Sequence, residues 1–488
     1  MKIRLPLYMS ARALNVIFCS VIFCFTVSCL NVQAQSAADL AYRNAVTPPP
    51  PGWTGPVFQL SHNYPTADPG PCSPKVCKWL ANKKVNFNLP LTGPAPTWGP
   101  AWNNYIQAIL DYVKQEQDPE LQNQAGWKID VSGETRWFHV PWMSYDPTRG
   151  REFVHGMTNE RTATLGDFGH EPQAGTNTLE HMSALGDLQN HPLFGANRLL
   201  LGAGRQTPKS FETWAFGAYN QWGAYAIGKS WSSDGVPIMG NYSGVTIPAG
   251  LPFPDGTVVA KLLFTSATPD DVPYLKNSPA WQVDRHDVKN GVFLCRRQVQ
   301  EVRLIQLDVA VVDSRSPTRW VFGTFAYNGN KAGNSPWDRL EPVGLQWGSD
   351  PFTFPATPKA ESIAARQSVL NTKIGTPQHF GCNGRLAGPV DNKLSSCLSC
   401  HGGSYAPPVG VAATPTTTPP IFGFEGECTN YSLGNAQYFD NVQFPMGYTG
   451  GQYAGLINLD TSLQLQVAFF QYGQYKQFGN PVACKASK

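Results

Sequence analysis

The sequence predicts a mainly β fold with a few helices, in which an antiparallel sheet is joined to an additional N-terminal region. The 42 prolines and 46 glycines among 488 residues indicate that much of the chain is turn and loop, which argues against a helical bundle. Three runs of β-branched and apolar residues, at 257–265, 302–312 and 319–327, predict strands. The polar, proline-containing turn 313–318 is expected to join the last two as a hairpin.

The N-terminus has the pattern of an export signal. Basic residues precede the apolar stretch 14–30, and Val32-Gln33-Ala34 fits the small-x-small rule for cleavage after Ala34. We therefore expect residues 1–34 to be a signal peptide and the protein to be periplasmic. An uncleaved membrane anchor is the alternative, because about 20 apolar residues span a bilayer, and lipid attachment at Cys29 is a third option. Only the anchored forms would place the protein at a membrane.

The charge of the chain excludes one class of partner. The formal net charge is +3, and the sequence has no run of lysine or arginine. Proteins that bind nucleic acid concentrate positive charge on one surface or segment. We therefore expect no nucleic-acid partner, and the length allows two compact domains or one large one.

The N-terminal region, residues 35–205, is rich in proline and aromatic residues. It opens with the four prolines of 48–51, an extended segment. Apolar residues recur at helical spacing over 102–113 and predict a helix, while 127–131 alternates as a short strand. The aromatic stretch 137–143 is expected to belong to the core, with a ligand contact as the alternative.

Two further elements are predicted around the C-terminal part of the chain. Residues 359–370 carry apolar side chains on one helical side and predict a helix. Residues 406–420 form a loop rich in proline and threonine, and the apolar segment 463–470 suits either a helix or a strand. We expect the extension 406–488 to pack on the preceding domain, residues 206–405.

One motif in the sequence predicts a specific chemical function. Cys397-Leu398-Ser399-Cys400-His401 matches C-x-x-C-H, in which two thiols add to the vinyl groups on one edge of a porphyrin and the histidine becomes the proximal iron ligand. A redox-active dithiol is the alternative, but it requires a thioredoxin-like βαβ context. We predict one covalently attached haem c, bound by Cys397, Cys400 and His401. Because the motif occurs once, a multihaem wire is excluded.

The remaining cysteines predict disulfides. Outside the signal and the motif, the chain has an even number of cysteines, namely Cys72, Cys77, Cys295, Cys382, Cys428 and Cys484. An even number in an exported protein favours disulfides, although the sequence does not choose between the pairings. Cys72 and Cys77 are close enough to close a small loop. A metal site built from these six cysteines is less consistent with the sequence than disulfides are, since no second C-x-x-C motif accompanies them.

Three segments in order carry a resemblance to a known family. They are Phe253 to Lys261 with its Asp-Gly-Thr motif, Leu307 to Ser314 leading to Trp320-Val321-Phe322, and the C-x-x-C-H motif. Together they resemble the cytochrome c-prime-beta family and the related cytochromes P-460, over roughly residues 210–401. The segment from Gly217 to Trp231 is similar to the helix before the family's Asp-Gly-Thr strand. The chain departs from the family in a longer stretch before the haem motif and in both terminal regions.

The resemblance implies a β-sheet haem domain with a five-coordinate iron and proximal His401. One branch of the family binds nitric oxide and similar gases, and the other oxidises hydroxylamine with a haem cross-linked to a lysine. Lys261 falls on the position of that lysine. The alternatives are that Lys261 points to solvent, or that it points inward without a cross-link and then needs a charged partner or a lowered pKa. The resemblance also implies a homodimer.

We weigh three functions on this basis. The first is binding or redox chemistry of a small diatomic or nitrogen-containing ligand at an open iron, which as catalysis would make the chain a haem c oxidoreductase. Its distal residue would come from 130–240, where the acidic candidates are Glu152, Glu160 and Glu171. The second is electron transfer to a redox partner protein with His/Met ligation by Met446, although an ordinary loop methionine is the alternative reading of that residue. The third is a partner-binding protein with an accessory haem.

Other histidines are weaker candidates. Bis-histidine ligation by His139, His155 or His379 is not supported by spacing. His170, Glu171, His181 and His191 have spacings that suit no common metal site. We interpret the latter group as solvated loop residues.

Overall fold

The fold is described from a computed structural model. It describes residues 36–43, 48–90, 93–145, 155–164, 210–289, 292–353, 365–376, 381, 384–391, 395–409, 437–446, 453 and 455–479. Residues Ala37–Lys488 form one compact unit. No helix within the described residues is long and apolar enough to cross a membrane. The predicted signal peptide, residues 1–34, lies outside the described residues.

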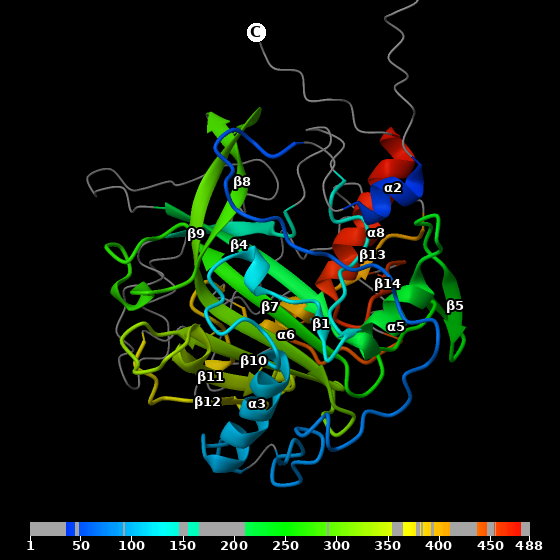
Figure 1. Cartoon of the computed structure of the whole chain (residues 1–488). Coiled ribbons are helices and arrows are strands. Elements are labelled where there is room, and N and C mark those ends of the chain that lie inside the picture. The colour runs from blue at the N-terminus through cyan, green and yellow to red at the C-terminus, as the bar shows by residue number, and fades with distance from the viewer. Residues whose placement is uncertain are drawn as a thin grey trace, which may run out of the picture. The chain divides into compact units, whose positions relative to one another are not determined.

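An antiparallel sheet dominates the unit, which confirms the predicted mainly β fold. In the described part of the chain it has eight strands in the order β12-β11-β10-β9-β7-β4-β3, and β8 pairs with β9 beside this path (Figure 1). The strands are β3 (Thr158–Thr164), β4 (Ser210–Tyr219), β7 (Val258–Thr265), β8 (Ala280–Lys289), β9 (Val292–Val312), β10 (Trp320–Tyr327), β11 (Leu340–Gln346) and β12 (Ser368–Leu370). The three strands predicted from the sequence are β7, the second half of β9, and β10.

The remaining elements are short or lie on the sheet. The helices are α2 (Ala37–Tyr42), α3 (Pro100–Val113), α5 (Gln221–Ser230), α6 (Cys397–Gly402) and α8 (Leu463–Phe478), with 3-10 turns η1 (Gln124–Gly126), η4 (Pro273–Leu275), η5 (Pro336–Arg339) and η6 (Pro351–Thr353). Three small ribbons are made by β1 (Asp130–Val131) with β2 (Glu134–Thr135), β5 (Met239–Tyr242) with β6 (Val245–Pro248), and β13 (Tyr405–Ala406) with β14 (Ile457–Asn458).

Strand register brings four residues of different strands into one row. Gly217 of β4 is the partner of Lys261 of β7, Lys261 is the partner of Asp308 of β9, and Asp308 is the partner of Thr324 of β10. Directly paired residues point to the same face of a sheet, and we call this face the site face. A second row on the site face consists of Tyr219, Val259, Ala310 and Phe322.

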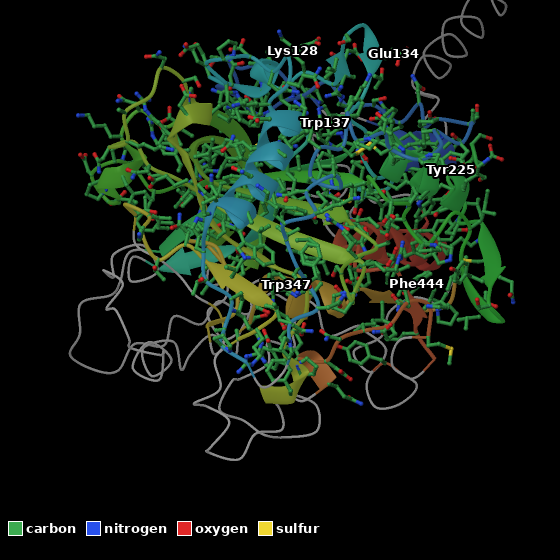
Figure 2. All side chains as sticks on the ribbon, turned by 90° about the horizontal axis from the view of Figure 1, so that it is seen from below. Lys128, Glu134, Trp137, Tyr225, Trp347 and Phe444 are labelled. Carbon is green, nitrogen blue, oxygen red and sulfur yellow. A yellow bond between two sulfur atoms is a disulfide. The ribbon has the colours of Figure 1, made fainter. Side chains whose placement is uncertain are left out.

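The opposite face is covered by N-terminal residues, α3 above all. Proline at its first position suits the start of a helix, where the backbone N–H has no partner, and its apolar side is buried as the spacing predicts. Trp102 of α3 stacks on Trp347, with ring centroids 4.7 Å apart (Figure 2). The Trp347 indole donates a hydrogen bond to the carbonyl of Phe87, 3.0 Å away. The predicted aromatic stretch is also core, since Trp137 and Trp142 are fully buried.

Trp347 provides a test of this packing. Trp347→Ala is expected to lower the free energy of unfolding by about 3–5 kcal/mol, because it removes a stacked, fully buried ring and leaves a cavity. Urea unfolding measures the change. Phe478→Ala is the control, since that ring is 57% exposed and its loss should cost far less. Equal effects of the two substitutions would contradict this account of the core.

Helix α8 packs on the site face. Leu465, Ala468 and Phe469 of α8 belong to the same buried cluster as Ala310 and Phe322 of the sheet. The segment 463–470, open between helix and strand from sequence, is the first half of this helix. Its N-terminus is capped by Ser462, whose side chain accepts a hydrogen bond from the backbone N–H of Leu465 at 3.1 Å.

Two predicted elements need correction. The helix predicted over 359–370 is wrong at Ser368–Leu370, which form the edge strand β12 paired with Gly344–Gln346; residues 359–364 lie outside the described residues. Pairing with a neighbouring strand outweighs local helical spacing here. The strand predicted over 127–131 keeps its alternating burial, but only Asp130–Val131 pair.

One disulfide prediction is confirmed. Cys72 and Cys77 are bonded, with an S–S distance of 1.97 Å and a Cα–Cα distance of 5.9 Å. Cys382, Cys428 and Cys484 lie outside the described residues, and the side chain of Cys295 is not described.

Candidate functional site

The C-x-x-C-H motif forms the short helix α6, fixed at its N-terminus by side chains of the sheet. The side-chain oxygen of Gln346 accepts a hydrogen bond from the backbone N–H of Leu398 at 2.9 Å, and its amide nitrogen donates to Ser396 Oγ at 3.0 Å. Ser396 caps the helix, and Leu398 is buried among side chains of the site face. Both cysteines and the histidine are therefore held at one place on the sheet.

The two cysteines of α6 remain partly accessible. The pKa of Cys397 is raised well above its ordinary value, mainly by burial and further by the carboxylates of Asp391 and Asp308. Redox-active dithiols depend on a lowered thiol pKa, because the thiolate is the nucleophile. The surroundings of Cys397 therefore argue against the dithiol alternative and leave thioether formation as the better use of the pair.

His401 has the orientation that an iron ligand needs. Its Nδ1 lies 2.9 Å from the backbone carbonyl oxygen of Thr461, and its ring centroid is 4.6 Å from that of Phe322. Because a carbonyl only accepts, this hydrogen bond places a proton on Nδ1 and leaves Nε2 of the neutral ring with a lone pair. A second partner that fixes the ring in this way is typical of metal-bound histidines.

The carbonyl of Thr461 is presented by a strained turn. Asp460 and Thr461 have φ angles of 50° and 64°, and the left-handed region is unfavourable for a β-branched residue such as threonine. Backbone strain of this kind persists only where surrounding contacts enforce it, and it is concentrated at functional sites. The turn that orients His401 is such a place.

Asp460 supplies the contacts that enforce the turn. Its carboxylate is 2% exposed and accepts hydrogen bonds from the backbone N–H of Phe253 at 2.8 Å and the indole of Trp320 at 3.2 Å. It also forms an ion pair with Arg319 at 3.3 Å. Burial raises the pKa of Asp460, and the positive charge of Arg319 opposes this shift. The turn is thereby tied to the end of the sheet.

A polar cluster lies on the site face beside Cys397. The hydroxyl of Thr324 donates to Asp308 at 2.8 Å and lies 3.8 Å from the sulfur of Cys397. The amide nitrogen of Gln306 donates to both Asp308 and Asp391, each at 2.8 Å. Burial raises the pKa of Asp308 to about 7, the charge of Asp391 adds to the shift, and the charge of Lys261 opposes it. The cluster therefore gains or loses a proton near neutral pH.

Asp308 is expected to make stability fall as the pH rises from about 4 to about 7. Its folded pKa of about 7 exceeds its ordinary value of 3.8, so the folded chain binds more protons than the unfolded chain in this interval. One pKa unit corresponds to about 1.4 kcal/mol. Asp308→Asn should reduce the fall measured by urea unfolding at pH 5 and pH 8, and Lys261→Met should increase it. An exposed control, Asp130→Asn, should leave it unchanged; an unchanged fall in Asp308→Asn would contradict the assignment.

Several side chains of the site face, α6 and the start of α8 remain partly accessible. On β7, Val258, Ala260 and Leu262 are fully buried on the opposite face, whereas Val259 and Lys261 on the site face remain partly accessible. The other partly accessible residues of the site are Asp308, Cys397, Cys400, His401, Thr461 and Gln464. The contacts given above link these elements to one another.

The residues predicted from sequence are only partly brought together. Lys261 shares the site face with Thr324, which contacts Cys397. Met446 is 62% exposed and does not belong to the apolar cluster that contains Leu398 and Cys397. His139 and His155 are buried, but they contact Phe216 and Trp214 of β4 and do not lie at α6 in the described structure.

The structure does not describe the side chains of several weaker candidate ligands. His379, Glu152, Glu171, His170, His181 and His191 lie outside the described residues. Glu160 belongs to β3, but its side chain is not described.

Sequence reasoning missed Asp308, Asp391, Asp460 and Thr461. For Asp308 a signal existed, because it is the one charged residue in the apolar run 304–312. For Thr461 none existed, since it acts through its backbone carbonyl and is 60 residues from His401.

No family model, curated protein or solved structure matches this chain. Its function is therefore argued from its own residues.

Proposed function

We propose that the chain is an exported monohaem c-type cytochrome whose iron binds or transforms a small diatomic or nitrogen-containing ligand at an open coordination position. The observation that carries the proposal is the placement of His401. It lies on the same helix as Cys397 and Cys400, and its Nδ1 is hydrogen-bonded to the carbonyl of Thr461 at 2.9 Å. This leaves Nε2 as the iron-binding nitrogen.

Each residue of the site has a separate task. Cys397 and Cys400 would hold the haem through thioether bonds, and His401 would bind its iron. When bound, the haem supplies a redox-active iron that can take up a small ligand. Thr461 orients the imidazole, Phe322 packs against it, and the carboxyl group of Asp308 holds a proton near Cys397. Lys261 supplies the positive charge next to that carboxyl group.

An open sixth position is preferred over His/Met ligation because Met446, the predicted thioether ligand, is not among the apolar side chains that pack together with Leu398 and Cys397. Electron transfer to a partner protein with a six-coordinate iron remains the second candidate function, since a coordinatively saturated haem also uses C-x-x-C-H attachment.

The ferrous optical spectrum tests the proposal. The purified protein is expected to show a high-spin spectrum that shifts at once when carbon monoxide or nitric oxide is added. Met446→Leu should leave both spectra unchanged. A low-spin spectrum that resists the gas in the wild-type chain, and responds to it in Met446→Leu, would support the electron carrier instead.

A further inference from the structure

A small pocket lies beside β4, and no residue of α6 is among those that line it. Residues of β4, of the 139–144 segment and of α8 line it, and its cavity volume is about 40 Å³. One water needs about 10–15 Å³ on this measure, so the pocket has room for a single ion with one or two waters and excludes larger organic molecules. The side chains that matter are those of His62, His139, Met143, Met157 and Gln464.

His139 is buried in this pocket without a hydrogen-bond partner. The side chain is 6% exposed, and neither ring nitrogen has a partner within the described residues. An unsatisfied buried polar group costs about 1–3 kcal/mol, so a ligand that satisfies it is expected. One neighbour is the ring of Phe216, with centroids 4.9 Å apart. The side-chain oxygen of Gln464, which also lines the pocket, is likewise without a partner.

His62 lines the same pocket and lies beside His139. The ring centroids of His62 and His139 are 6.4 Å apart, with the ring planes inclined at 69°. A metal about 2.1 Å from each nitrogen allows centroids at most about 6.4 Å apart, so the two rings lie at the limit of the separation at which both can reach one ion.

The remaining donors identify the metal. Met143 and Met157 contribute thioethers to the lining, and the described residues that line the pocket include no aspartate, glutamate or cysteine. Thioether and imidazole donors suit copper, whereas magnesium and calcium require oxygen ligands and zinc sites use thiolate, imidazole or carboxylate. We propose that this pocket is a copper site in which His62 and His139 bind the ion together with the thioether of Met143 or Met157.

One cationic side chain, that of Arg43, also lines the pocket. It is exposed to solvent, where its charge is screened.

Copper binding is measured by anaerobic titration of the full chain with Cu(I) against a chromophoric chelator. The Cys397→Ser/Cys400→Ser chain is used beside the haem-loaded protein, because free thiols would bind copper themselves. This background also makes the test independent of the haem proposal. We expect one Cu(I) per chain in both, and a loss of affinity of about 100-fold or more in His139→Gln and in His62→Gln.

Matched variants separate binding from folding. Met143→Leu/Met157→Leu preserves side-chain volume and is expected to weaken Cu(I) binding with little change in thermal unfolding. Met239→Leu and Met446→Leu replace residues that are not among those lining the pocket, and these variants should bind Cu(I) as tightly as the parent chain. Undiminished binding in the His62 and His139 variants, no stoichiometric Cu(I) in the parent chain, or preferential uptake of zinc would each overturn the proposal.

Discussion

A chain in which Cys397 and Cys400 are both serine is expected to be recovered without covalently bound haem, whereas the wild-type chain is expected to carry one haem. In the proposed function the two thiols are the attachment atoms, and both cysteines are partly accessible on α6. The loss should be complete, because haem held only by an iron–histidine bond dissociates under denaturing conditions. Mass spectrometry of the denatured protein and the optical spectrum of the denatured, reduced protein both measure it.

The control for this experiment uses the other described cysteines. Cys72 and Cys77 form a disulfide, so a Cys72→Ser/Cys77→Ser chain should keep its haem even where its stability is reduced. The prediction fails if the wild-type chain has the mass of the bare polypeptide after expression with an intact c-type maturation system. Such a result would also remove the basis of the proposed function.

Asp460→Ala is expected to lower the free energy of unfolding by about 3–5 kcal/mol. The substitution leaves Arg319 without its buried counter-charge and the N–H groups of Phe253 and Trp320 without an acceptor, and breaking a buried pair from one side carries a cost of about this size. It also releases the strained turn at Thr461. The haem spectrum should therefore change together with the stability, as the imidazole of His401 loses its fixed orientation.

Two further substitutions test whether the effect of Asp460→Ala comes from the contacts of this buried carboxylate. Asp460→Asn keeps a side-chain oxygen acceptor, and since burial already raises the pKa of Asp460, removal of its charge should cost much less than removal of the side chain. Asp255→Ala removes a more exposed acceptor for the backbone N–H of Ser314 and is expected to stay within about 1 kcal/mol of the wild type. If Asp460→Ala lowers stability but leaves the haem spectrum of the wild type, the turn does not position His401.

Much of the fold could be predicted because the residue types and spacing within a segment determine these helices and strands. The runs at 257–265 and 319–327 are rich in β-branched and aromatic residues, and they appear as β7 and β10. The helix over 102–113 has a regular apolar spacing and appears as α3. Edge strand β12 could not be predicted in this way, because its three residues are held by pairing with β11, a contact that local spacing does not encode.

The candidate site, too, could be predicted only where its residues are neighbours in the sequence. The C-x-x-C-H motif is contiguous and identifies three residues at once. The partners of those residues come from elsewhere in the chain, and some, such as the carbonyl of Thr461, have no side-chain signature. The cluster of Asp308 and Asp391 likewise depends on which strand lies beside the motif. His62 and His139 are 77 positions apart, and only the fold places their rings 6.4 Å from each other.

Thr461 follows His401 by 60 positions in the chain, and this separation bears on the order in which the proposed haem site is completed. The attachment of haem to two cysteines uses five consecutive residues and needs no tertiary structure. The hydrogen bond that orients the imidazole forms only after the chain has been completed past residue 461 and the long-range contact has closed, which is a slow class of folding event. A newly made chain would thus pass through a stage in which its haem is bound but its proximal histidine still turns freely, and this stage is when a wrong ligand could capture the iron.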